Sequence, residues 1–209
     1  MNDQPAPTAP LDLGPAAGRV ARLLDGVTDD QLAAPTPCPE YAVHALLSHL
    51  LGLSVAFRDA GRKALGPTTS TAPEGAPPAL PADWRLLLPR RLDEVADAWR
   101  APAAWEGTTQ AGGVTLPGEV AGRVALNEIV LHGWDLARAT EQPYEADEAS
   151  VHELIAFLTP PDDASTDEPA PDDAPDSIFG PPVPVPGDAP PLDRLVGLSG
   201  RDPHWPHPH

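Results

Sequence analysis

The stretch Asn127–Asp135, which reads Asn-Glu-Ile-Val-Leu-His-Gly-Trp-Asp, constrains the fold more than any other part of the chain. Glu128 and His132 are four residues apart, so a helix places their side chains on one face, one turn from each other. Mostly apolar residues flank them, from Val120 to Ala137. A carboxylate and an imidazole buried in such surroundings need a polar partner, because unpaired polar groups are costly in a protein core. The stretch therefore predicts a core helix, and a divalent metal ion is one partner that would satisfy both side chains.

Apolar stripes elsewhere predict the other helices of the fold. The predicted helices cover residues 11–27, 42–65, 83–100, 117–140 and 147–158, with a short one at 192–198. Pro117 suits the first turn of its helix, whereas Pro89 lies inside a predicted helix and implies a kink or a later start. Strand signals are nearly absent, so the predicted fold class is all-α, a four-helix bundle with short extra helices.

Breaker residues predict the connections between these helices. Residues 28–31, Thr-Asp-Asp-Gln, are typical of a capping box, and the prolines of residues 34–39 predict a rigid connector. Residues 66–81 are rich in Pro, Thr, Ala and Gly and predict a loop. Residues 107–116 are expected to form a turn or a small β-hairpin.

A third polar side chain, His49, lies within the apolar run of the helix predicted at residues 42–65. Together with Glu128 and His132 it offers two nitrogens and one carboxylate from two helices. This is the donor set of an open zinc site with three protein ligands and one position free for water or substrate. Each residue also has a simpler explanation: His49 as a hydrogen-bonded core histidine, and Glu128 with His132 as an intrahelical hydrogen bond. The residues alone leave both interpretations open.

Three segments carry a resemblance to a known family: Thr36–Tyr41 (Thr-Pro-Cys-Pro-Glu-Tyr), Leu46–Leu50 (Leu-Leu-Ser-His-Leu) and Asn127–Arg138. They resemble the metal-binding branch of the DinB-like superfamily, which includes the N-terminal domain of mycothiol-dependent maleylpyruvate isomerase. The resemblance extends from about residue 11 to residue 158. Shorter pieces near residues 179–186 and 200–203 resemble it as well.

The resemblance implies a DinB-like four-helix bundle with a metal held by a His on the second helix and by a Glu and a His four residues apart on a later one. These positions match His49, Glu128 and His132. The implied metal is zinc, with nickel or another divalent ion as alternatives. The resemblance assigns no residue here to catalysis or to thiol binding.

The function implied by the resemblance is that of a transferase or isomerase in which the metal activates a thiol. Mycothiol is the possible co-substrate, and an electrophilic small molecule is the expected partner. The isomerase has a second, C-terminal domain where this chain has only an acidic Pro-rich segment and a short tail, so isomerase activity itself is not expected. The alternatives are a metal-dependent hydrolase, with Asp135 as the nearest candidate base, and a non-catalytic, stress-related metal-binding module. Asp135 has a competing interpretation as the residue that orients His132.

Several other polar side chains are assigned ordinary roles. Cys38 is expected to be a packed thiol and Trp134 a core residue, with lining of the pocket as the alternative for Trp134. Arg123 and Arg138 are expected to form surface salt bridges, with binding of a substrate carboxylate by one of them as the alternative. The same two interpretations apply to Arg201.

The composition excludes several classes of partner. The formal net charge is −18, which argues against nucleic acid and against an anionic membrane surface. No apolar run is long enough to span a bilayer, and the N-terminus lacks the pattern of a signal peptide. The single cysteine excludes an internal disulfide and is compatible with a reducing, cytoplasmic setting. The sequence is compatible with a monomer or a homodimer.

The domain organisation follows from a change in composition after the last helix of the predicted bundle. Residues 159–191 contain eight acidic residues and no basic one. The predicted parts are a flexible N-terminus (1–10), the metal-binding bundle (11–158), a disordered acidic Pro-rich segment (159–177), an extended strip and short helix that pack back on the bundle (178–203), and a flexible tail (204–209).

Overall fold

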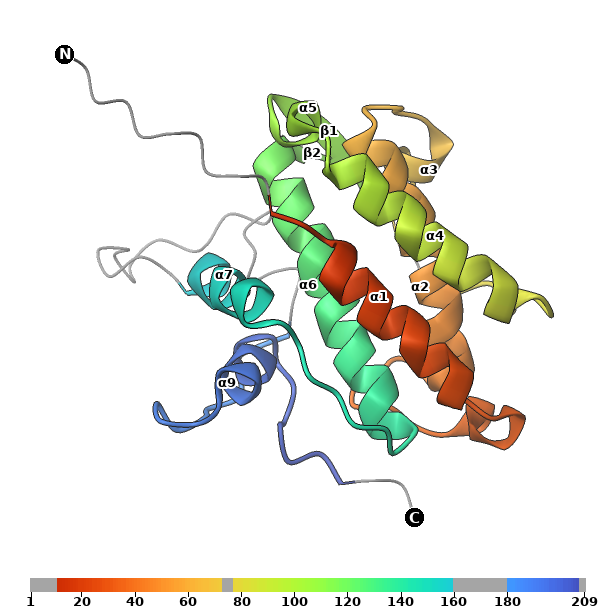
Figure 1. Ribbon diagram of the computed structural model, residues 1–209, viewed down its shortest axis with the longest axis vertical. Helices are drawn as coiled ribbons and strands as arrows, with labels where there is room; N and C mark the ends of the chain where they lie inside the picture. Colours follow the sequence, from red (N-terminus) through yellow and green to blue (C-terminus); the bar gives the residue numbers. More distant parts are fainter. Residues whose placement is uncertain (1–10, 73–76, 160–179, 207–209) are drawn as a thin grey trace.

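Four long helices form the centre of the molecule (Figure 1). The computed structural model describes residues 11–72, 77–159 and 180–206. The bundle helices are α1 (Gly14–Leu23), α2 (Val43–Gly61), α4 (Trp84–Trp99) and α6 (Gly118–Ala139). Both α1 and α2 pack against α4 and α6, so the four helices close a ring around a shared core. The prediction of an all-α, four-helix bundle is confirmed.

The core of the bundle consists of the apolar stripes that the sequence predicts. Leu46 and Leu50 on α2 and Leu126 and Ile129 on α6 are completely buried. Their spacings of three or four residues place each pair on one side of its helix. Burial of such a side chain contributes about 1.5–3 kcal/mol each, so packing of these faces holds α2 and α6 together. This pairing sets the position of His49 on α2 relative to Glu128 and His132 on α6.

The limits of α1 and the end of α2 differ from the predictions, since α1 covers Gly14–Leu23 rather than residues 11–27. Helix α2 ends at Gly61 rather than near residue 65, because Lys63 adopts a left-handed backbone with φ of 56°. The N–H of Ala64 then bonds to the Asp59 carbonyl at 2.9 Å and closes the helix end. Helix α4 runs from Trp84 through Pro89, so the alternative of a later start is wrong.

The connections contain short elements. These are the 3₁₀ turns η1 (Leu24–Gly26) and η2 (Asp29–Ala33), the single-turn helices α3 (Pro67–Ser70) and α5 (Pro102–Trp105), and strands β1 (Thr108–Ala111) and β2 (Val114–Pro117). The two strands pair antiparallel, which confirms the hairpin alternative, and with α5 they cover one end of the bundle (Figure 1). Gln31 accepts a hydrogen bond from the Thr28 N–H at 3.0 Å, the glutamine half of the predicted capping box.

The C-terminal part adds two helices on one flank of the bundle (Figure 1). Helix α7 (Glu148–Leu158) contacts α6, and α9 (Pro191–Leu198) packs against α7. Residues 180–186 run beside α9, where the Val183 N–H donates to the Gly197 carbonyl. The predictions for residues 1–10 and 207–209, for most of the acidic segment, and for the first two residues of the extended strip lie outside the described residues. None of the helices that the structure describes is both long and apolar enough to cross a bilayer.

Candidate metal centre

The structure brings the three predicted side chains together between α2 and α6. Glu128 Oε2 lies 3.4 Å from His49 Nε2 and 3.2 Å from His132 Nε2. The two imidazole rings are 4.9 Å apart and nearly perpendicular, at 87°. His132 is 6% exposed, whereas His49 and Glu128 are 18% and 16% exposed, so the cluster is closed on the His132 side and open on the other.

These separations fit a divalent cation. A tetrahedral zinc ion with ligands at about 2.0–2.1 Å separates neighbouring ligand atoms by about 3.3 Å. The two N···O separations at Glu128 Oε2, 3.4 and 3.2 Å, are of this size, and all three potential ligand atoms lie within 4.8 Å of one another. His49, Glu128 and His132 are therefore spaced to hold a cation without rearrangement of the helices.

Asp135 fixes the orientation of His132. Its Oδ2 lies 2.9 Å from His132 Nδ1, and its carboxylate is completely buried. A carboxylate at Nδ1 holds a proton there, so when the ring is neutral its Nε2 lone pair is directed at Glu128 and His49. The interpretation of Asp135 as the residue that orients His132 therefore agrees with the structure.

Close packing behind His132 explains the glycine in the motif. A Cβ atom on Gly133 would lie 2.8 Å from both the Tyr144 hydroxyl oxygen and Val20 Cγ2. The Tyr144 hydroxyl donates to the Val130 carbonyl at 2.9 Å, which holds the phenol ring against the helix. The small residue thus lets α1 and Tyr144 approach α6 closely beside His132.

Tyr41 forms a wall of the cluster that the sequence analysis did not identify as functional. Its ring stacks on His49 with centroids 4.9 Å apart and an interplanar angle of 30°. The Thr36 hydroxyl lies 2.7 Å from the Tyr41 carbonyl and 3.0 Å from that of Cys38, within donating distance of both, and accepts from the Cys38 N–H. The proline-rich connector is thus folded by Thr36 so that Tyr41 covers His49. Tyr41 ends the segment Thr36–Tyr41, which carries part of the family resemblance, and this resemblance was the only sign in the sequence that Tyr41 could be functional.

The two buried charges support each other. Burial alone would raise the pKa of Glu128, but hydrogen bonds with His132 and His49 outweigh burial and lower it. Burial alone would lower the pKa of His132, but hydrogen bonds with Asp135 and Glu128 outweigh it and raise the pKa to about 9. The metal-free cluster is therefore held together by a protonated imidazole between two carboxylates.

Cys38 belongs to a second group of possible ligands, with His132 and Asp135. Burial and the nearby Asp135 charge raise the pKa of the Cys38 thiol to about 11, so the thiol stays protonated at neutral pH. The Asp135 carboxylate also accepts from Arg201, with Nη2 3.2 Å from Oδ2. A cation would have to displace both the thiol proton and the guanidinium, so this group is much less suited to metal than the cluster at Glu128. Cys38 is a packed thiol, as predicted.

The other polar residues singled out in the sequence lie away from the cluster or bind elsewhere. Arg123 pairs with Glu153 at 2.7 Å, as expected for a salt bridge. Arg138 Nη2 donates to the Trp205 carbonyl at 2.9 Å. Trp134 is buried in the core as predicted.

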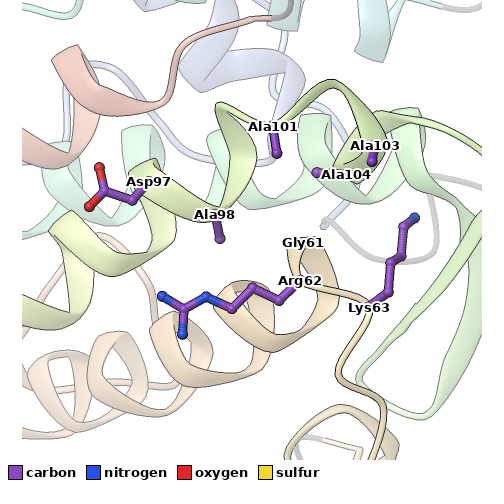
Figure 2. A pocket seen from close by; sticks show the side chains of 8 residues that line it. All are labelled: Gly61, Arg62, Lys63, Asp97, Ala98, Ala101, Ala103 and Ala104. Carbon is purple, nitrogen blue, oxygen red and sulfur yellow. The ribbon is translucent and has the colours of Figure 1, made fainter.

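A pocket of about 320 Å³ lies between the end of α2, α4 and α5 and is distinct from the cluster (Figure 2). Gly61, at its edge, is twelve residues beyond His49 on α2, about 18 Å along the helix. Alanines make up half of its lining, and the Lys63 ammonium beside it donates to the carbonyls of Glu106 and Thr108. Nothing in this lining resembles the converging donors at Glu128.

The metal-free protein is expected to lose stability as the pH rises from about 6.5 to about 9. The folded state raises the pKa of His132 above its ordinary value of 6.5, so it binds this proton more tightly than the unfolded state does. The resulting stabilisation is complete below the unfolded pKa and is lost as the pH rises through the folded pKa. Urea unfolding at a series of pH values, with a chelator present, measures the effect.

The control for this measurement is His132→Gln, which keeps a polar side chain but cannot be protonated. Its free energy of unfolding should vary less between pH 6.5 and 9 than that of the wild type. Parallel pH profiles for the two proteins would contradict the assignment of the proton to His132.

Comparison with known proteins shows which family has this sequence and fold. The sequence model of the mycothiol maleylpyruvate isomerase N-terminal domain matches residues 13–137. Two uncharacterised proteins of Mycobacterium tuberculosis, from strains CDC 1551 / Oshkosh and ATCC 25618 / H37Rv, are each 31% identical over 185 residues, covering 87% of this chain and 91% of the relative. A crystal structure of a mutant of mycothiol-dependent maleylpyruvate isomerase is similar in fold, with a TM-score of 0.56 and 18% identity. The similarity covers 70% of this chain and 66% of that one, so the chain spans just under two thirds of the solved protein.

Proposed function

Because this chain belongs to the mycothiol maleylpyruvate isomerase N-terminal domain family, we propose that it binds a divalent metal ion and uses a small thiol, such as mycothiol, in a transferase or isomerase reaction on an electrophilic substrate. The observation that carries the proposal is the convergence of His49 Nε2 and His132 Nε2 on Glu128 Oε2. Zinc is the preferred ion, since two imidazoles and one carboxylate are a typical zinc donor set.

The charge of this donor set supports a thiol as the group that is activated. Two neutral imidazoles and one carboxylate leave a bound divalent cation with a net positive charge. Such a cation lowers the pKa of a coordinated thiol and so favours the nucleophilic thiolate. The protein's own contribution is to hold the donors: Asp135 keeps the proton of His132 on Nδ1, and the ring of Tyr41 restricts His49.

The open side of the cluster is the route by which a thiol would enter. His49 and Glu128 are partly exposed, while His132 is almost covered and Asp135 is fully buried. Tyr41 lies at this open side, where burial raises the pKa of its phenol and keeps the hydroxyl protonated at neutral pH. A thiol that approaches there would pass Tyr41 before it reaches the donors.

The hydrolase alternative receives less support. It requires a base that faces the open position, and Asp135 was the nearest candidate in the sequence. Its carboxylate bonds to His132 Nδ1, on the side of the ring opposite to Glu128, and to Arg201. It is therefore not placed to take a proton from a water molecule at the open position.

Metal content and thiol response test the proposal together. His204, His207 and His209 should first be removed, because a terminal histidine cluster can bind metal on its own. We expect elemental analysis to find about one divalent ion per chain, and the absorption spectrum of the cobalt-substituted protein to change on addition of mycothiol. A screen of electrophiles with mycothiol, followed by mass spectrometry of the products, then identifies the reaction.

The outcomes separate the possible functions. Metal binding with no spectral response to any thiol would overturn thiol activation and favour the hydrolase or the non-catalytic module. Purified protein that takes up no divalent ion, while remaining folded, would overturn the proposal as a whole.

A further inference from the structure

Arg201 reaches the candidate metal centre from the C-terminal part of the chain. Its guanidinium lies against the Asp135 carboxylate, with Nη2 3.2 Å from Oδ2 and Nε 3.5 Å from Oδ1. The two residues are 66 positions apart in the sequence. The same Oδ2 also lies 2.9 Å from His132 Nδ1, so one carboxylate links the arginine to a proposed metal ligand.

The local backbone holds Arg201 firmly in this position. Gly200 has a left-handed φ of 78°, and a Cβ atom there would lie within 3.0 Å of the Gly180 backbone. The Arg201 N–H donates to the Val196 carbonyl at 3.1 Å, and its Nη1 donates to the Ser199 carbonyl at 2.9 Å. The C-terminal strip, α9 and the turn after it therefore present the guanidinium in one orientation.

The Asp135 carboxylate needs this arginine for two reasons. It has no exposed surface, and a buried carboxylate without sufficient charged partners is costly. The planar guanidinium also contacts both carboxylate oxygens, which restricts rotation of the carboxylate in a way that a point charge would not. With its plane fixed, Asp135 can hold the Nδ1 proton of His132 and keep Nε2 aimed at Glu128.

We propose that Arg201 is a positioning residue that fixes His132 through Asp135, so that the C-terminal segment, residues 180–206, completes the metal centre. This segment lies outside residues 13–137, to which the family model extends. The inference rests on the proposed metal-binding function for its effect on affinity. The link between Arg201 and the His132 ring is independent of any metal.

The test compares Arg201→Met with Arg194→Met, a control that removes the same charge from an exposed position on α9. Both variants are made in the full-length chain without the tail histidines. The dissociation constant for cobalt(II) is measured by chelator competition. Solvent exchange of the His132 Nδ1 proton is measured by NMR on the metal-free protein, with His132→Gln used to assign the signal.

We expect Arg201→Met to weaken cobalt binding by about 10-fold, the lower end of the 10- to 100-fold effect of removing the direct hydrogen-bond partner of a metal-ligating histidine, because Arg201 acts through Asp135. The Nδ1 proton should exchange faster, while Arg194→Met behaves as the wild type in both measurements. Arg201→Lys restores the charge but not the bidentate contact with Asp135. Its cobalt affinity and its Nδ1 exchange rate should therefore lie between those of the wild type and Arg201→Met.

A folded Arg201→Met protein with wild-type affinity and wild-type proton exchange would overturn the inference. If Arg201→Met does not fold, Arg201→Lys is the deciding variant. Wild-type cobalt affinity and wild-type proton exchange in Arg201→Lys would show that the bidentate contact of Arg201 does not fix His132. If the wild type binds no metal, the proposed function fails, yet the exchange measurement on the metal-free protein still decides whether Arg201 controls His132.

Discussion

Replacing His49 by alanine should weaken binding of a divalent cation by at least about 100-fold and leave the helical bundle intact. His49 is the only proposed ligand that comes from α2, and without it a cation would be left with two donors from α6. Loss of the hydrogen-bond partner of a metal ligand already lowers metal affinity about 10- to 100-fold, so loss of the ligand itself should lower it at least as much. Chelator competition with cobalt(II) or zinc(II) gives the affinity, and circular dichroism monitors the fold.

His44→Ala is the matched control for this experiment. His44 is exposed on the same helix, and its Nδ1 lies 2.9 Å from the Leu32 carbonyl, away from Glu128. Its removal should leave cation affinity unchanged. If His49→Ala and His44→Ala bound cations equally well, His49 would not be a ligand and the metal centre would have to lie elsewhere.

Replacing Trp99 by alanine should destabilise the protein by about 3–5 kcal/mol, the usual cost of truncating a buried aromatic side chain. Trp99 is completely buried, its Nε1 donates to the Phe57 carbonyl at 3.0 Å, and its ring packs edge-on against Trp105. A Cβ atom on Gly61 of α2 would lie 3.0 Å from Trp99 Nε1, and one on Gly122 of α6 would lie 2.9 Å from Trp99 Cζ3, both shorter than ordinary van der Waals contact. The alanine variant thus leaves a cavity where three helices meet.

Denaturant unfolding of Trp99→Ala and Leu86→Ala measures this effect against a control on the same helix. Leu86 is 67% exposed, so its truncation should change stability by no more than about 0.5 kcal/mol. If both variants lost similar amounts of unfolding free energy, the face of α4 that carries Trp99 would not be part of the hydrophobic core.

The helices and the three proposed ligands could be predicted because their signals are local. Apolar stripes identified α2 and α6, and the four-residue spacing placed Glu128 and His132 on one face. That His49 meets them required the packing of two helices, which the family resemblance supplied and periodicity could not. The end of α2 was misplaced because Lys63, rather than a glycine, takes the left-handed position at which many helices stop.

The roles of Tyr41 and Arg201 could not be read from local patterns. Tyr41 stacks on His49 because Thr36 folds the connector, and no periodicity describes such a loop. Arg201 meets Asp135 only after α9 has packed against α7 and brought the chain back to α6. Both contacts depend on tertiary structure, and an arginine or a tyrosine in a loop has many equally plausible partners before the fold is known.

The distance in sequence between His49 and Glu128 has a consequence for the order of assembly. The two residues are 79 positions apart, and closing a loop of that length in a disordered chain costs about 4 kcal/mol in entropy. Of the three proposed donors, an unfolded chain therefore offers a cation only the neighbouring pair Glu128 and His132. Native docking of α2 on α6 closes the loop beforehand and adds the third donor. Cation uptake would thus lag behind docking of these two helices during refolding, and the rate of loading would report when that docking occurs.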